Sequence, residues 1–154
     1  MSIESKLETL NLKLPEASSP KGNYVSAVQT GALVFVSGSI CMIAGAMTHE
    51  GKAGGEQTVE SAYEGARVCL LNSLAVLQEF LGSLDRIRQV VSLAGFVNAV
   101  EGFAQSPKVI NGASDLLVEI FGPVGAHSRT AVAVSGLPLN STVELQMVVE
   151  VSDK

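Results

Sequence analysis

Charged residues are scarce in this sequence, and no basic excess is present. Asp, Glu, Lys and Arg make up only 16% of the 154 residues, whereas hydrophobic residues make up 47%. A small monomer must cover itself with polar surface, so this composition leads us to expect apolar surface buried between subunits. The formal net charge of −5 argues against nucleic-acid binding, which relies on clustered Lys and Arg.

Long apolar runs and export signals are also lacking. No uninterrupted apolar stretch approaches the roughly 20 residues that a membrane-spanning helix needs. The first residues, MSIESKLETLNLKLP, lack the basic segment followed by an apolar run that marks a secretory signal. We therefore expect a cytoplasmic location without membrane association. In that compartment Cys41 and Cys69 are expected to be free buried thiols.

Metal sites and the common catalytic motifs are missing as well. His49 and His127 lie too far from each other and from the cysteines to form a metal-ligand spacing. No glycine-rich phosphate loop and no nucleophile elbow occurs. Cys41 has no basic neighbour in sequence that would lower its pKa. We expect neither a metal nor an organic cofactor.

Hydrophobic periodicity and turn residues divide the chain into expected elements. Gly82 and the Gly122-Pro123 pair fit the ends of two helices. Residues 40–55 end in HEGKAGG, which is typical of a mobile surface loop. The expected elements are an edge strand at 10–14, a hairpin of 24–29 and 33–38, a helix from Thr58 to about residue 80, a strand at 87–97, a helix at 107–121 capped by Ser106, and two strands, 128–135 and 143–150, around a turn.

This order predicts one α+β domain spanning residues 1–154. Helices interleaved with mostly antiparallel strands indicate two layers, with both helices on one face of the sheet. No helix remains to cover the other face. A second subunit could cover it.

Two charged residues interrupt the apolar strands near the carboxyl end. Arg129 shares a strand face with Ala131 and Ala133, whose small side chains leave room for a ligand, and Glu144 alternates with apolar neighbours. Tyr24 and the Ser37-Gly38 pair also lie at strand positions or strand ends. Each has an ordinary explanation, such as a solvated face or a half-buried tyrosine, and spacing alone does not favour a functional one.

Two separated segments together resemble one known family. GNYVSAVQTGALVFVSGSI, residues 22–40, resembles the GPYSQAV…GNLVFVSGQI segment of the reactive-intermediate imine deaminase (RidA/YjgF-like) family, also labelled endoribonuclease L-PSP. RTAVAVSGLPLNSTVELQ, residues 129–146, resembles the family's R(S/T)(C/A)V-V--LP----VEIE. Both motifs keep the family's spacing, and the resemblance covers nearly the whole chain.

The resemblance implies a chorismate-mutase-like homotrimer with sites in clefts between subunits. It also implies hydrolysis of reactive enamine or imine acids, such as 2-aminoacrylate, to 2-keto acids and ammonia, without a cofactor. The substrate is then a small carboxylate. By the same resemblance, Arg129 binds the carboxylate, Glu144 places the attacking water, Tyr24 and Ser37 line the pocket, Gly38 and Ala131 contribute backbone, and Asn111 matches a pocket asparagine.

Departures from the family pattern mark a divergent branch. Ala131 stands where a cysteine is common, Ser39 stands where glutamine is usual, and the segments 41–57 and 105–128 are longer. Two other functions therefore stay open. One is a carboxylate-binding or regulatory trimer without turnover. The other is a ribonuclease or translation inhibitor, against which stand the acidic charge and the lack of a histidine pair.

Overall fold

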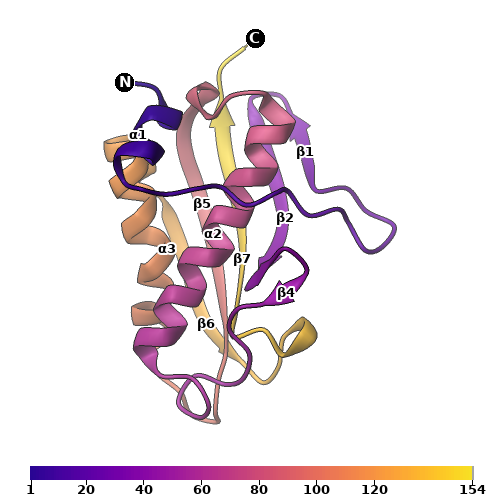
Figure 1. Ribbon diagram of the computed structural model, residues 1–154, viewed down its shortest axis with the longest axis vertical. Coiled ribbons are helices and arrows are strands. Elements are labelled where there is room, and N and C mark those ends of the chain that lie inside the picture. The colour runs from indigo at the N-terminus through magenta and orange to yellow at the C-terminus, as the bar shows by residue number, and fades with distance from the viewer. Residues whose placement is uncertain (154) are drawn as a thin grey trace.

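A computed structural model describes residues 1–153 of the chain. Three helices, α1 (Ile3–Thr9), α2 (Val59–Leu81) and α3 (Ser106–Phe121), lie on one face of a five-stranded sheet (Figure 1). The two-layer α+β architecture is therefore confirmed, with one short helix more than predicted. No helix within these residues is long and apolar enough to cross a membrane.

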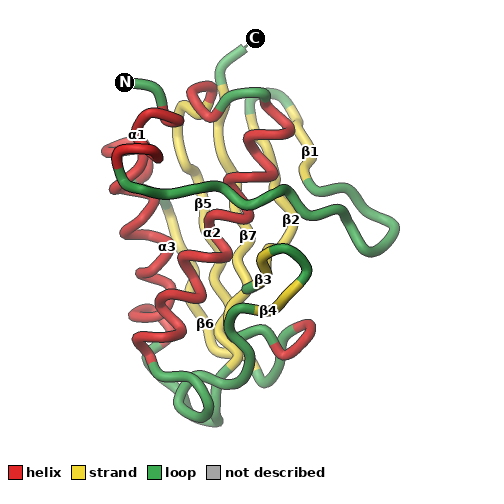
Figure 2. Tube along the Cα trace, in the orientation of Figure 1, coloured by secondary structure: helices red, strands yellow, loops and turns green. Residues whose placement is uncertain are grey.

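The sheet has the strand order β1-β2-β7-β5-β6, and a two-stranded ribbon of β3 and β4 lies beside it (Figure 2). All neighbouring strands are antiparallel except β5 and β6. The strands are β1 (Ala27–Thr30), β2 (Leu33–Ile40), β3 (Met42–Ile43), β4 (Ala46–Met47), β5 (Ile87–Asn98), β6 (Ser128–Val134) and β7 (Val143–Val151), and the short 3-10 turns are η1 (Leu84–Arg86), η2 (Gly122–Gly125) and η3 (Pro138–Asn140).

The last two strands exist as predicted, but they do not pair with each other. β5 lies between them, parallel to β6 and antiparallel to β7. Parallel neighbours need a long crossover connection, and the chain from β5 through α3 to β6 supplies it. The prediction of two strands around a turn was therefore wrong about pairing, because strand alternation does not reveal which strands are neighbours.

Local signals fix the ends of the longest helix. The Oγ1 of Thr58 accepts a hydrogen bond from the Ser61 amide (3.0 Å), and the Ser61 hydroxyl accepts one from the Thr58 amide (2.9 Å). Gly82 ends α2 with a left-handed φ of 83°. α3 begins one residue earlier than predicted. Ser106 is therefore its first residue, and Gln105 occupies the cap position without a side-chain bond.

The core lies between the helices and one sheet face. Each buried leucine there stabilises the fold by about 1.5–3 kcal/mol. The approach of α2 and α3 is close, because a Cβ on Gly112 would lie only 2.1 Å from the carbonyl oxygen of Tyr63. The largest fully buried side chains are Leu70, Leu74, Leu77, Leu84, Leu93, Ile110, Leu116, Leu117, Leu145, Met147, Val34 and Val36.

Two segments differ from the sequence prediction. Residues 10–26 form an irregular strap that crosses α2 (Figure 1), and not an edge strand. The alternating residues Leu10, Leu12 and Leu14 pack against the core instead. The 48–56 segment is packed and not a free loop, because the Ala53 amide donates to the Asn98 carbonyl (2.8 Å) and Ala53 is fully buried.

Candidate functional site

The predicted site residues fall into two groups at different places on the sheet. Tyr24, Ser37, Gly38 and Glu144 lie around β2 and β7, whereas Arg129, Ala131 and Asn111 lie on β6 and α3. β7 and β6 are two strands apart, which corresponds to about 10 Å across the sheet. Within one chain the structure therefore does not bring Glu144 and Arg129 together.

The two charged residues also occupy different faces of the sheet. Arg129 is paired with the buried Leu93, so it points to the helix-covered side. The neighbours of Glu144, Val143 and Leu145, are fully buried on that same side, so Glu144 points to the helix-free side.

A groove of about 620 Å³ borders the first group. It exists because β1 is short: the pairing of β1 with β2 ends at Ala27 and Val36, so no strand pairs with the rest of β2 on that side. Tyr24, Gly38 and Glu144 all line this groove. The other lining segments are residues 15–19, Lys21, 39–40, 42–45, Asn72 and 138–139.

Glu144 is half-buried where the groove meets β7. Burial raises the pKa of its carboxyl above the ordinary value, because the charged form loses hydration. A Cβ on Gly38 would lie 3.2 Å from the Glu144 Cδ, so glycine leaves the room that the carboxyl occupies. None of the hydrogen bonds recorded within residues 1–153 uses this carboxyl. It is therefore available to a ligand.

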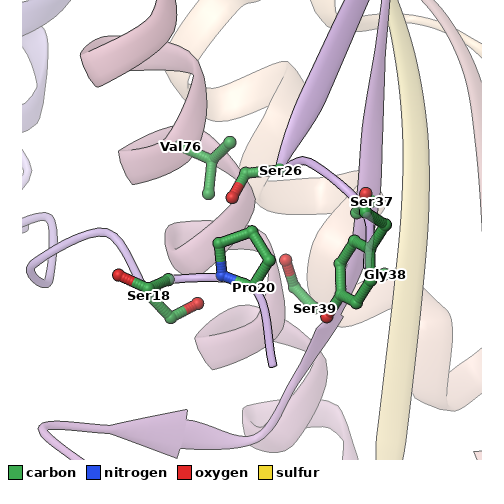
Figure 3. Close-up of a pocket in the computed structure, with 9 residues that line it drawn as sticks. Ser18, Pro20, Ser26, Ser37, Gly38, Ser39 and Val76 are labelled. Carbon is green, nitrogen blue, oxygen red and sulfur yellow. The ribbon is translucent and has the colours of Figure 1, made fainter. Parts of the chain in front are cut away.

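A smaller pocket of about 30 Å³ adjoins the groove and has room for about one water molecule. Figure 3 shows Ser18 and Pro20 of the strap facing Ser37, Gly38 and Ser39 across it. The Ser37 hydroxyl donates to the Val25 carbonyl (2.7 Å), so only its lone pairs remain for a ligand. Tyr24 also lines this pocket, and its side chain is largely exposed.

Arg129 is held by α3. Its Nη1 donates to the Asn111 Oδ1 (2.7 Å) and to the Ser114 Oγ (3.1 Å), which uses both hydrogens of that nitrogen. No hydrogen bond recorded in the described part of the chain uses Nε or Nη2. These two nitrogens form the edge of the guanidinium that presents parallel N–H groups to a carboxylate.

The orientation of Ser114 follows from His127. The His127 Nδ1 lies 2.6 Å from the Gly125 carbonyl, which can only accept, so Nδ1 carries a hydrogen. In the neutral ring Nε2 then accepts from the Ser114 Oγ (2.9 Å), which leaves the Ser114 lone pairs for Arg129. Sequence reasoning missed both residues. The usable signal was the i, i+3 spacing of Asn111 and Ser114 on one helix face.

Ala131 lies on the same strand face as Arg129 and packs against the core. Sequence reasoning expected space for a ligand beside the guanidinium on this face. In the structure Asn111 and Ser114 of α3 contact the guanidinium there. The available edge of Arg129 is therefore the one that α3 does not use.

Two free thiols lie inside the core and do not line the groove. Cys41 and Cys69 are fully buried, with their Sγ atoms 3.6 Å apart. The hydrogen bond from Cys69 lowers the pKa of Cys41 to about 7, whereas burial raises the pKa of Cys69. Cys41 has no basic neighbour in sequence, and the lowering of its pKa comes instead from Cys69, which is distant in sequence. In the described part of the chain, no cluster of three His, Cys, Asp or Glu residues could hold a metal ion.

Comparison with known proteins places these features in a family. Residues 4–151 match the family described as "YjgF/chorismate_mutase-like, putative endoribonuclease". Protein TCP17 of Trypanosoma cruzi is 40% identical, with 98% of this chain and 95% of that protein covered. The crystal structure of Atu1372 from Agrobacterium tumefaciens, a protein of unknown function, is 39% identical, with a TM-score of 0.91 over 97% of this chain and 92% of that one.

A third relative, a "putative endoribonuclease" of Shewanella oneidensis MR-1, has a crystal structure that is 35% identical. Its TM-score is 0.94, with 98% of this chain and 100% of that chain covered. The family match spans nearly every element of the sheet and both long helices. The chain therefore belongs to the YjgF/chorismate-mutase-like family.

Proposed function

We propose that this protein hydrolyses reactive enamine or imine acids to 2-keto acids and ammonia, in sites formed between the subunits of a homotrimer. The observation that carries the proposal is Glu144: a half-buried carboxyl with a raised pKa and no intramolecular hydrogen bond, facing a groove. A carboxyl whose pKa is shifted toward the working pH can both take and return a proton.

The surface of the helix-free sheet face supports a trimer. Val28, Phe35 and Val132 are 53%, 42% and 40% exposed, and each lies on the face opposite the buried core residues. Exposed apolar side chains on an uncovered sheet favour association. One group borders the unpaired part of β2 and the other lies on the edge strand β6, so a cyclic assembly that joins these two regions would bring Arg129 of one subunit toward the groove of the next.

In such a site the Nε and Nη2 edge of Arg129 binds the substrate carboxylate and orients the C=N bond beside Glu144. Glu144 removes a proton from water as the water oxygen bonds to the imine carbon. The same proton then passes to nitrogen, which gives an adduct with a hydroxyl and an amino group on one carbon. Glu144 next takes the hydroxyl proton and delivers it to the amino nitrogen as the C–N bond breaks, so that NH3 leaves and the C=O bond forms. Tyr24 and Ser37 line the wall, and Gly38 leaves space for the carboxyl. No metal or organic cofactor is needed.

The test combines the purified protein with an enzyme that generates 2-aminoacrylate and follows keto-acid formation. We expect the parent protein to accelerate keto-acid formation. Glu144→Gln should lose most of this acceleration but should still bind 2-keto acids. Turnover of Glu144→Gln within about twofold of the parent would contradict the assigned role, since a positioned acid or base contributes about 10²–10⁴-fold. Light scattering should give a trimer mass for both proteins.

The other two functions are distinguished by the same preparation. Binding of keto acids without acceleration would favour a carboxylate-binding regulator. RNA cleavage that persists unchanged in an Arg129→Ala, Glu144→Ala double variant would be contamination, whereas its loss would favour a ribonuclease. The proposal includes a cytoplasmic location, with which the free thiols of Cys41 and Cys69 are compatible.

A further inference from the structure

Glu144 lies where a polar part of the groove meets an apolar one. Toward the strap most of the lining is polar, with Glu16, Ser18, Ser19 and Lys21 beside Pro15 and Ala17. Toward the β3–β4 ribbon and η3 it is apolar, consisting of Ile40, Met42, Ile43, Pro138 and Leu139. The groove volume of about 620 Å³ falls in the range of about 300–1,000 Å³ that suits drug-sized ligands. In one chain taken alone, a small acid such as 2-aminoacrylate would leave most of it unfilled.

Hydrogen bonds hold the apolar walls in place before any ligand binds. The Asn72 Nδ2 on α2 donates to the carbonyls of Ile40 (3.0 Å) and Met42 (2.7 Å), which ties the corner between β2 and β3 to the helix. On the other wall, the Gly51 amide donates to the Asn140 carbonyl (2.9 Å) beside Leu139. Ligand pockets are usually formed in advance in this way.

Backbone strain also occurs at one wall of this groove. Leu139 lines the groove with a left-handed backbone, φ 54°, whereas the left-handed φ of 52° at Ala44 belongs to the two-residue turn between β3 and β4. Such conformations are unfavourable for residues with a Cβ, persist only where the surroundings impose them, and gather at functional sites. The Leu139 side chain is 59% exposed, so packing against the core of this chain does not account for its position, and a ligand seated in the groove would contact it.

We propose that the substrate carries a large aliphatic side chain, of the leucine or methionine class, which occupies the apolar part of the groove while its C=N carbon lies beside Glu144. This inference rests on the proposed function, because it assigns the substrate class of that same site. Each methylene that becomes buried there should strengthen binding about fourfold.

Calorimetry with two 2-keto acids, which stand for the product, tests the inference without requiring turnover. We expect the parent to bind 4-methyl-2-oxopentanoate on the order of 10- to 60-fold more tightly than pyruvate. In an Ile43→Thr, Leu139→Asn double variant this preference should fall to about threefold or less, with pyruvate affinity unchanged. Asparagine tolerates the left-handed backbone at 139, and threonine keeps β-branching at 43, so the fold is preserved. Val118→Ser, an exposed apolar residue outside the groove lining, is the matched control.

Each alternative outcome overturns the inference. Equal affinities in the parent, tighter binding of pyruvate, or no binding of either acid would exclude an aliphatic subsite. If the double variant kept the preference for the larger acid, the residues that bind the aliphatic side chain would have to lie elsewhere. Loss of trimer mass in that variant alone would mean that a neighbouring subunit covers these residues. Failure of the proposed function is a separate result: the parent then binds the larger acid but hydrolyses no imine.

Discussion

The Nη1 of Arg129 lies 2.7 Å from the Oδ1 of Asn111, and this contact divides the guanidinium into a structural edge and an available edge. Nη1 is fully used by Asn111 and Ser114, whereas Nε and Nη2 have no recorded partner in residues 1–153. Asn111 therefore positions the Arg129 side chain, and its Oδ1 is engaged in doing so.

Arg129→Ala should weaken keto-acid binding by on the order of 10- to 150-fold. A charge-assisted bidentate pair contributes roughly 1.5–3 kcal/mol, and about 1.4 kcal/mol corresponds to a factor of ten. Arg129→Lys should recover only part of the affinity, because an ammonium cannot offer two parallel N–H groups. Calorimetry measures both, with trimer mass as control. Unchanged affinity together with a weakened trimer would make Arg129 a structural residue.

Ser114→Ala should raise KM by about 2- to 12-fold and leave kcat nearly unchanged. The hydroxyl connects His127 to Arg129, and a neutral hydrogen bond contributes about 0.5–1.5 kcal/mol. Ser114→Thr keeps the hydroxyl and should restore the parent KM. A fall in kcat at constant KM, or a failure of threonine to rescue, would assign Ser114 a different role.

Sequence and structure agree most closely where the signals are local. The ends of α2 could be predicted from Thr58 and Gly82, because a helix cap and a left-handed glycine form hydrogen bonds only with residues a few positions away. The placement of β5 between β6 and β7 could not be predicted from the sequence. The alternation of apolar and polar residues along a strand is the same whichever strand lies beside it. Ser114 and His127 belong to no recognised motif, and their roles appear only when α3 lies against β6.

The pH dependence of stability should change in Glu144→Gln. Burial raises the pKa of Glu144 above its ordinary value of 4.5. The stability linked to its protonated form is therefore fully present below pH 4.5 and is lost as pH rises through the folded-state pKa. As pH rises through this range, urea unfolding should show the free energy of unfolding of the glutamine variant increasing relative to that of the parent. The gain should stay below about 1 kcal/mol, because solvent screens a half-exposed group. A constant difference at all pH values would contradict the shifted pKa.

Neither cysteine should react with iodoacetamide in the folded protein, even above pH 7. The lowered pKa of Cys41 favours the reactive thiolate, but Cys41 and Cys69 are both fully buried. Mass spectrometry should show no modification until urea unfolds the chain. Glu119→Cys, which places a thiol on the exposed surface of α3, should be alkylated at once as the positive control. Rapid labelling of Cys41 in the native protein would show that the core opens readily.

Subunit mixing tests the central claim most directly, because it asks whether Arg129 and Glu144 from different chains form one site. Arg129→Ala and Glu144→Gln are each expected to be inactive in imine hydrolysis. In mixed trimers assembled at equal ratio, about a quarter of the interfaces combine an intact arginine with an intact glutamate. Co-refolding the two variants should therefore restore about a quarter of the parent activity. Mixed trimers that form, as shown by mass, and remain as inactive as either variant alone would contradict an intersubunit site.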